Sequence, residues 1–469
     1  MWLRPVPLQN EFPRRCDKRK RRAAYAMKPE LREAGAAANR DAPAKTRRAA
    51  LVFIFITLVL DMLALGMIVP VLPKLVEDFV HGDTARAAYI VGVFGTVWAL
   101  MQFVFSPVLG ALSDRYGRRP VVLVSNFGLG LDYIVMALAP SVWWLFVGRV
   151  ISGITSASFS TASAYVADVT PPENRAGAFG MLSAAFGLGF VLGPALGGVL
   201  GEMDPRLPFW VAAGLSLLNA MYGLFVLPES LTRDRRAAFV WRRANPFGSI
   251  TLLRSNIELL GLSVVNFIGF IAHEALPTTF VLYAMYRYQW NARMVGLAIA
   301  TVGVCSALVG AGMVQPLVAK FGERRVMLTG LWFNLAGFIS YGLAPTGLIF
   351  WAAIPIGAMG GLSGPPMQGL MTRQVKPTEQ GQLQGALGSI RGVAFMIGPV
   401  FFSAVFVSFI GPYRGWHLPG APYLLAAALI TISTIVAWRV TTAQAAKEAL
   451  TVHPAGAQPP FKRGPAAPS

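Results

Sequence analysis

Charged residues are scarce in this chain of 469 residues: Asp, Glu, Lys and Arg together supply 13% of it, about half the share found in soluble domains. Cysteine is scarcer still, with two residues in the whole sequence. The first lack excludes an ordinary water-covered surface, and the second excludes a disulfide framework. Catalytic signatures are also missing, since the sequence contains no HExxH motif, nucleophile elbow or P-loop. We therefore expect neither an enzyme nor a metal or cofactor site.

Hydrophobic residues supply 55% of the chain, and apolar runs of about 20 residues recur from Leu51 to Trp438. Each run is long enough to cross a hydrocarbon core about 30 Å thick. The spans must be helical, because backbone polar groups find no partners in lipid. The pattern predicts an all-α membrane protein with about twelve spans, near residues 50–73, 88–112, 121–139, 142–166, 177–200, 208–227, 257–285, 293–318, 326–344, 347–370, 383–410 and 421–438.

The formal net charge of +19 comes from basic residues that lie in alternate loops between the spans, rather than from one basic patch that could bind a ligand. The segment Cys16–Arg22 resembles a nuclear signal, but the other basic residues gather in alternate loops, at Arg115, Arg118 and Arg119, at Arg233–Arg243, and at Lys320–Arg325. This alternation is the positive-inside bias, so both termini are expected in the cytoplasm, and nucleic acid is not an expected partner. The lack of long outer loops favours a bacterial inner membrane.

The two ends are predicted to be disordered cytoplasmic tails. Residues 1–48 are basic and contain no apolar segment of a signal peptide. They are expected either to touch anionic lipid or, if translation starts near Met27, to lie partly outside the true protein. Residues 441–469 end in a proline-rich stretch.

The membrane region repeats itself at a constant offset. Three pairs of similar segments start 205 positions apart, at Leu112 and Leu317, Thr170 and Val375, and Phe190 and Phe395. We therefore divide the region into two parallel six-helix repeats, residues 49–227 and 257–440, joined by a cytoplasmic linker at 228–256. Two such repeats with a site between them are typical of transporters.

Four segments then give the chain a specific resemblance. "GALSDRYGRRPVVL" resembles the signature loop between spans 2 and 3 of the major facilitator superfamily, "GRVISGITSASFSTASAYVAD" its fourth-span motif, and "GLGFVLGPALGG" the fifth-span motif of its antiporters. "DMLALGMIVPVLPKL" is similar to the first span of the drug/proton antiporters that include the tetracycline exporters. The resemblance covers about Leu51 to Trp438 and implies the major facilitator fold.

The resemblance also implies roles for two groups of residues. The loop cluster is expected to hold the two halves in one conformation; it consists of Gly110, Asp114, Arg115, Gly117 and Arg118, and the second copy carries Ala319 in place of its aspartate. The fifth-span glycine motif is expected to pack closely and to discourage leak in exporters; it consists of Gly189, Gly193, Pro194, Gly197 and Gly198.

Ionisable residues inside a span are functional candidates by default. Asp61, Asp132 and Arg149 all lie roughly 15–20 Å above the cytoplasmic ends of their spans, at the helical rise of 1.5 Å per residue. They are predicted to approach one another and to couple transport to protons, because burial favours the protonated carboxyl and a nearby arginine favours the carboxylate. The positions 205 residues later are Asn266, Gly337 and Ile354, so the second half has no matching group. Asp61 has a structural alternative, which is to brace a broken helix near Gly66 and Pro70.

The candidates for substrate binding are Gln102, His273, Glu274, Ser306 and Asn334. Gln102 matches a polar position of the tetracycline exporters, although a lone glutamine is often an interhelical hydrogen bond. Glu274, beside His273, is expected to gate, to contact substrate, or simply to reach lipid headgroups. Ser306 and Asn334 stand where tetracycline exporters carry a histidine in some classes and an aspartate, so the chain departs from their pattern at both positions.

These features together predict a monomeric secondary transporter whose partners are a small-molecule substrate, protons and the bilayer. The favoured function is proton-coupled export of small amphipathic compounds, tetracycline-like or multidrug. Two alternatives stay open: a proton-coupled importer of a small metabolite on the same fold, and a membrane sensor that transports nothing.

Overall fold

The structure is a computed structural model, and it describes residues 44–155, 158–170, 174–231, 236, 250–376 and 379–452. The first part of the chain forms α2 (Ala44–Ile68), α3 (Leu72–Phe79), α4 (Thr84–Tyr116), α5 (Arg118–Ala137), α6 (Val142–Thr155), α7 (Ser158–Val169), α8 (Arg175–Met203) and α9 (Leu207–Val226). The second part forms η4 (Ile250–Arg254), α10 (Ile257–His273), α11 (Ala275–Tyr288), α12 (Ala292–Leu308), η5 (Val309–Met313), α13 (Val314–Phe321), α14 (Glu323–Leu343), α15 (Gly347–Ala352), α16 (Ile354–Ala358), η6 (Met359–Leu362), α17 (Gly364–Arg373), α18 (Gln380–Ile410), η8 (Arg414–Trp416) and α19 (Ala421–Val452).

The predicted helical membrane fold is confirmed. Within the described residues, 11 helical segments are long and apolar enough to cross a membrane, and each falls on one of the runs read from the sequence. The remaining expected span, 142–166, corresponds to the shorter apolar helix α6 followed by α7.

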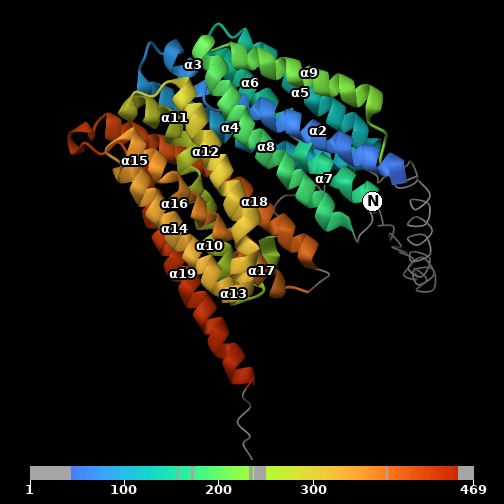
Figure 1. Cartoon of the computed structure of the whole chain (residues 1–469), viewed down its shortest axis with the longest axis vertical. Helices are drawn as coiled ribbons and strands as arrows, with labels where there is room; N and C mark the ends of the chain where they lie inside the picture. Colours follow the sequence, from blue (N-terminus) through green and yellow to red (C-terminus); the bar gives the residue numbers. More distant parts are fainter. Residues whose placement is uncertain are drawn as a thin grey trace, which may run out of the picture.

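Figure 1 shows two helix bundles that diverge from a common end. The first bundle contains α2–α9, drawn in blue to green, and the second contains α10–α19, drawn in yellow-green to red. Two long helix pairs join them, because α4 packs along α18 and α8 packs along α12, and α11 adds smaller contacts with α4 and α3. The limits of the two predicted domains remain predictions, and α19 continues as a helix to Val452, beyond the expected boundary at 440.

The internal repeat reappears in the backbone. Gly117, between α4 and α5, has φ +111°, and Gly322, between α13 and α14, has φ +81°. These two glycines are 205 residues apart, and both adopt a region that side chains with a Cβ rarely enter. The same turn therefore closes the second helix pair of each half.

We call the face that carries Arg118, Arg119, Arg324 and Arg325 the basic face. The bundles are in contact near the opposite face, where a Cβ on Gly198 of α8 would lie 3.1 Å from the Cα of Gly296 in α12. Asn291, at the start of α12, donates a hydrogen bond of 2.8 Å to Glu202 of α8 in the same region.

The contact between the bundles ends about halfway along the helices. Among the glycines, the inter-bundle contacts nearest the basic face are those of Gly303 with Val191 and of Gly392 with Phe103. Nearer the basic face, a Cβ would meet no atom within 4 Å at four further glycines, namely Gly177, Gly180, Gly310 and Gly388. The two bundles are therefore closed together at one face and apart at the basic face.

Several spans are interrupted rather than continuous. The first breaks between Ile68 and Leu72, as Gly66 and Pro70 had predicted, because proline removes a helical hydrogen bond. The seventh breaks at Glu274, between α10 and α11, and the eighth contains the π-helical turn η5. The predicted tails 1–43 and 453–469 and the linker residues 232–235 and 237–249 lie outside the described part of the chain.

Candidate functional site

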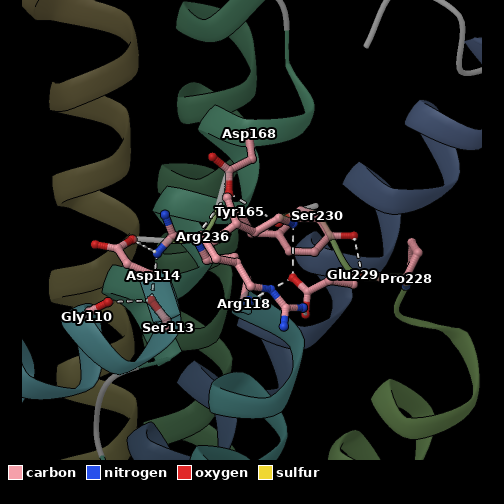
Figure 2. Close-up of polar contacts among 11 residues, drawn as sticks. Gly110, Ser113, Asp114, Arg118, Tyr165, Asp168, Pro228, Glu229, Ser230 and Arg236 are labelled. Carbon is pink, nitrogen blue, oxygen red and sulfur yellow. Dashed lines mark hydrogen bonds and ion pairs between the residues drawn. The ribbon is translucent and has the colours of Figure 1, made fainter. Parts of the chain in front are cut away.

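The loop cluster is organised around Arg118, the first residue of α5. Its guanidinium pairs with Asp114 at 2.6 Å and with Asp168, at the end of α7, at 3.1 Å. It also donates a hydrogen bond of 2.6 Å to the Ser113 hydroxyl, which in turn donates to the Gly110 carbonyl. Figure 2 shows these contacts converging from α4, α5 and α7. Asp168 is thus a direct partner of the cluster.

Glu229 was missed by the sequence reading, and it completes this cluster. Its carboxylate accepts a hydrogen bond of 2.8 Å from the Arg118 backbone N–H and lies 4.0 Å from the guanidinium of Arg236 (Figure 2). The room for that carboxylate comes from Gly117, where a Cβ would collide with it. The signal lay in "PES", which places a carboxylate directly after the last span of the first half.

The cluster does not bridge the two bundles in this conformation, because all its described partners belong to the first bundle or to the start of the linker. Arg115 lies over the Tyr116 ring, 5.1 Å from its centroid. Gly110 has open space around it and makes no close helix approach. In the second copy a different pair forms, with Arg373 2.9 Å from Glu323. The proposed role in holding the halves therefore remains a prediction for another conformation.

The fifth-span glycine motif packs α8 against two neighbours. A Cβ on Gly193 would lie 2.8 Å from the Cα of Gly66 in α2, and one on Gly197 would lie 2.6 Å from the Met67 Cα. Gly189 faces Met62 in the same way. On the other side Gly198 faces α12, and Pro194 lies against Gly66. The motif thus forms a seam that connects the first helix of one bundle to a helix of the other.

Asp132 of α5 and Arg149 of α6 form a buried pair inside the first bundle. The guanidinium lies 3.9 Å from the carboxylate, and the Asp132 side chain is fully buried. Arg149 also approaches the sulfur of Met136 at 3.4 Å. No described residue makes a hydrogen bond of good geometry to either carboxylate oxygen of Asp132, and the Ser152 hydroxyl is a nearby polar group. The pair is therefore held by charge in a nearly dry site, which makes it sensitive to loss of either partner.

Asp61 has a different partner. The Asn219 amide of α9 donates a hydrogen bond of 2.9 Å to its carboxylate and another of 3.1 Å to the Thr57 carbonyl. The buried ring of Tyr133 lies within electrostatic range of Asp61, Asp132 and Arg149. The structure therefore places the three predicted residues in one neighbourhood, with Asp61 hydrogen-bonded to Asn219 rather than to Arg149.

A second charged group lies in the other bundle. Glu274, at the break between α10 and α11, is buried and lies within electrostatic range of Arg391 of α18. His273 also lies within electrostatic range of Arg391, and Gly398 of α18 packs directly on the Glu274 side chain. The sequence reading had taken the second half to lack a counterpart of the first-half group, and it overlooked Arg391, an arginine in the middle of the predicted span 383–410.

The remaining substrate candidates lie on three different helices. Asn334 of α14 donates a hydrogen bond of 3.4 Å to the Gly360 carbonyl, inside the second bundle. Ser306 is exposed on α12, and Gln102 is half-buried on α4 beside Phe103. Among the described residues, no three His, Cys, Asp or Glu side chains are grouped to hold a metal ion.

Comparison with known proteins assigns the chain to a family. The model of the Major Facilitator Superfamily matches residues 54–319 and 262–466, which is most of the chain. The chain belongs to the major facilitator superfamily. Its resemblance to the drug exporters of this superfamily, predicted from four motifs, is confirmed.

Two curated relatives in the superfamily are tetracycline resistance proteins. The class C protein of Escherichia coli is 38% identical over 80% of this chain and 95% of its own length. The class G protein of Vibrio anguillarum is 36% identical over 76% of this chain and 90% of its own. The assignment of the chain as an integral membrane transporter follows from these relatives and from the apolar helices.

Among solved structures, a bacterial homologue of the human lysosomal transporter Spinster, in an inward-facing and unoccupied conformation, superposes with a TM-score of 0.69. It is 15% identical and covers 86% of this chain and 98% of its own. The match shows that the two chains share the superfamily fold.

Proposed function

We propose that the protein is a proton-coupled antiporter that exports small amphipathic compounds across a bacterial inner membrane. The basic face is then the cytoplasmic face, by the positive-inside rule. With that assignment, the structure described above is open to the cytoplasm and closed to the outside, and both termini are cytoplasmic.

One observation supports proton coupling above all others: two buried carboxyl groups stand in the middle of the first bundle. Asp61 is 4% exposed and Asp132 is not exposed at all. A carboxyl group in such a site gains little from water when ionised, so protonation and the approach of a cation compete to neutralise it.

When the bundles open outward, Asp61 would take a proton; when they open inward, it would release the proton to the cytoplasm, and the substrate would enter from the same side. The α2–α8 seam begins one residue after Asp61, at Met62, so a change of charge there acts on the helix pair that also contacts α12. The Asp132–Arg149 pair would hold a compensating charge beside it.

The test uses everted membrane vesicles with an acidified lumen and a pH-sensitive dye. Tetracyclines, fluoroquinolones and lipophilic cations are added in turn, and alkalinisation of the lumen is recorded. We expect at least one class to alkalinise the lumen of vesicles carrying the native chain, and Asp61→Asn to abolish the signal at equal protein content.

The matched control is Asp78→Asn. Asp78 is exposed and pairs with Lys74 at 3.1 Å, and surface pairs of this kind contribute little. Its loss should leave the signal intact. Alkalinisation that survives Asp61→Asn would contradict the assignment of Asp61, and inward accumulation of a metabolite would favour the importer.

A further inference from the structure

Arg391 is an intramembrane arginine that the proton-coupling scheme does not use. It lies 11 residues into α18, or about 17 Å from the end of that helix at the basic face. It is exposed, although it sits in the middle third of a membrane span. A guanidinium at this depth is expected to pair with a charge or to face a water-filled cavity.

Within the described part of the chain, no protein group satisfies this guanidinium. Among the described residues it makes no hydrogen bond and no ion pair within 4.0 Å, and its recorded neighbours are aromatic rings and more distant charges. Glu274 is close enough to attract it electrostatically without touching it. The five N–H donors of the guanidinium are therefore available to a ligand.

Two rings form the surroundings of Arg391. Its guanidinium carbon lies 4.9 Å from the centroid of Phe395, one turn further along α18, and 5.7 Å from that of Phe270 on α10. The rings meet edge to face, with centroids 6.4 Å apart and an interplanar angle of 82°. A flat apolar group could stack on these half-buried rings while its charge reaches the arginine.

The position of Arg391 points to the space between the bundles. The adjacent Gly392 packs on Phe103 of α4, at the glycine contact between α18 and the first bundle that is nearest the basic face, whereas Gly388, one turn toward the basic face, has no neighbour within 4 Å. Arg391 thus stands where the closed part of the molecule gives way to the open part. A substrate entering from the basic face would reach it directly.

We propose that Arg391, Phe395 and Phe270 form a binding site for amphipathic organic anions, in which an aromatic or similarly flat body lies on the two rings and a carboxylate or equivalent group pairs with the guanidinium. Glu274 and His273 border the site: Glu274 opposes the anion by its charge and so limits affinity. The inference rests on the proposed transport function and assigns a class of substrate to it.

Binding is measured on the full chain in lipid nanodiscs with tritiated 2-naphthoate, and with 2-naphthamide and 2-naphthylmethylammonium as competitors of the same shape. We expect the naphthoate to bind, and both competitors to displace it at least about tenfold less well than unlabelled naphthoate, because a charge-assisted bidentate pair exceeds a neutral hydrogen bond by about that factor. Equal competition by the amide or the cation would overturn the proposal.

Three arginine variants locate the site. Arg391→Gln should weaken naphthoate binding at least about tenfold, and Arg391→Lys should weaken it less, because lysine keeps the charge and loses the planar fork. The matched control Arg414→Gln removes one positive charge from an exposed turn at the opposite face and should leave affinity unchanged. Native affinity in Arg391→Gln would overturn the proposal.

Glu274→Gln supplies a second test in case the arginine variants fail to fold. Removal of the neighbouring negative charge should increase naphthoate affinity severalfold. Unchanged or weaker binding in folded Glu274→Gln would overturn the site.

The vesicle assay separates this inference from the transport function. Proton movement driven by a lipophilic cation, with no naphthoate binding, would leave antiport standing and remove the anion site. If naphthoate binds through Arg391 and no compound drives proton movement, the anion site would stand and proton antiport would be removed.

Discussion

At the residue scale, some of the buried charged groups in the first bundle are held by partners on other helices. Asp132 and Arg149 answer each other across α5 and α6, and Asp61 receives an amide from α9. Such sites are shielded from water, so removal of one partner leaves a buried charge without compensation. The stability lost in this way exceeds the stability that the contact itself contributes.

The Asp132–Arg149 pair should show this asymmetry. Arg149→Gln leaves a fully buried carboxylate without its counter-charge and is expected to cost about 3–5 kcal/mol of stability. The double variant Asp132→Asn/Arg149→Gln should recover most of that loss. Thermal unfolding of the four proteins in one detergent completes the double-mutant cycle, and strictly additive losses would contradict a coupled pair.

Asn219 should be needed for proton coupling in a way that other buried amides are not. Asn219→Ala removes the hydrogen bond to Asp61 and should reduce substrate-driven proton movement in vesicles. Asn256→Ala is the matched control, because that half-buried amide donates a hydrogen bond of 3.0 Å to Gln374 within the second bundle. Equal loss in the two variants would point to general destabilisation.

The sequence predicted the titratable residues better than their partners. A carboxylate within an apolar run attracts notice because insertion is costly, whereas Asn219 is an uncharged amide whose cost is small and whose partner is 158 residues away. Arg391 escaped because the 205-residue comparison looked only at the positions matching Asp61, Asp132 and Arg149. A search for every charge within a span would have found it.

At the scale of elements, the positions of glycines determine where α8 packs closely against its neighbours. On α8 the glycines at 189, 193 and 197 recur every four residues and face α2, so the two backbones meet directly. Gly187 lies on the same helix, yet a Cβ there would meet open space. The sequence predicted the packing face from spacing alone, but the partner helix required the fold.

Two alanine substitutions on α8 should therefore differ in sign. Gly197→Ala places a methyl group 2.6 Å from the Met67 Cα and should cost about 1–3 kcal/mol through overpacking. Gly187→Ala should be neutral or stabilising by up to about 1 kcal/mol, because alanine is the better helix former. Thermal unfolding midpoints measure the stability of both variants. Equal shifts would show that α2 moves aside to accommodate the added methyl group.

At the scale of the whole molecule, the number and limits of the spans were predictable because hydrocarbon thickness sets their length. The breaks were less so. Pro70 predicted the interruption after α2. The seventh span, by contrast, is interrupted at Glu274, and the nearest following proline is Pro277, so no proline marks that break in the sequence. Nor does the sequence state which ends of the bundles meet, since the same residues must serve each conformation of a transporter.

Crosslinking the closed face should stop transport. In a background with Cys16 and Cys305 replaced by serine, Glu202→Cys/Asn291→Cys places two thiols across the bundle boundary, where the native side chains bond at 2.8 Å. A short bifunctional thiol reagent should hold that face closed and abolish transport in vesicles until a cleavable reagent is reduced.

A pair inside one bundle provides the control. Asn256→Cys/Gln374→Cys replaces two side chains that bond at 3.0 Å within the second bundle. Each pair removes one asparagine N-cap, from α12 and α10 respectively, so the structural costs are matched. Crosslinking this pair should leave transport intact, and equal inhibition by both would show that the reagent acts otherwise than by holding the bundles together.

The charges around the middle of the spans have an electrical consequence. Three carboxylates, Asp61, Asp132 and Glu274, stand there with two guanidinium groups, Arg149 and Arg391, so one proton brings their formal charges into balance. A protonated carrier would then change between its two conformations without moving net charge, and the membrane voltage would act on the return step, in which the deprotonated carrier moves with its cargo. If an organic anion leaves as a proton enters, both movements run down the voltage, and a potential of 100 mV would supply about 4.6 kcal/mol to each exchange. An electrode would register two charges per cycle, where an uncharged cargo would give one.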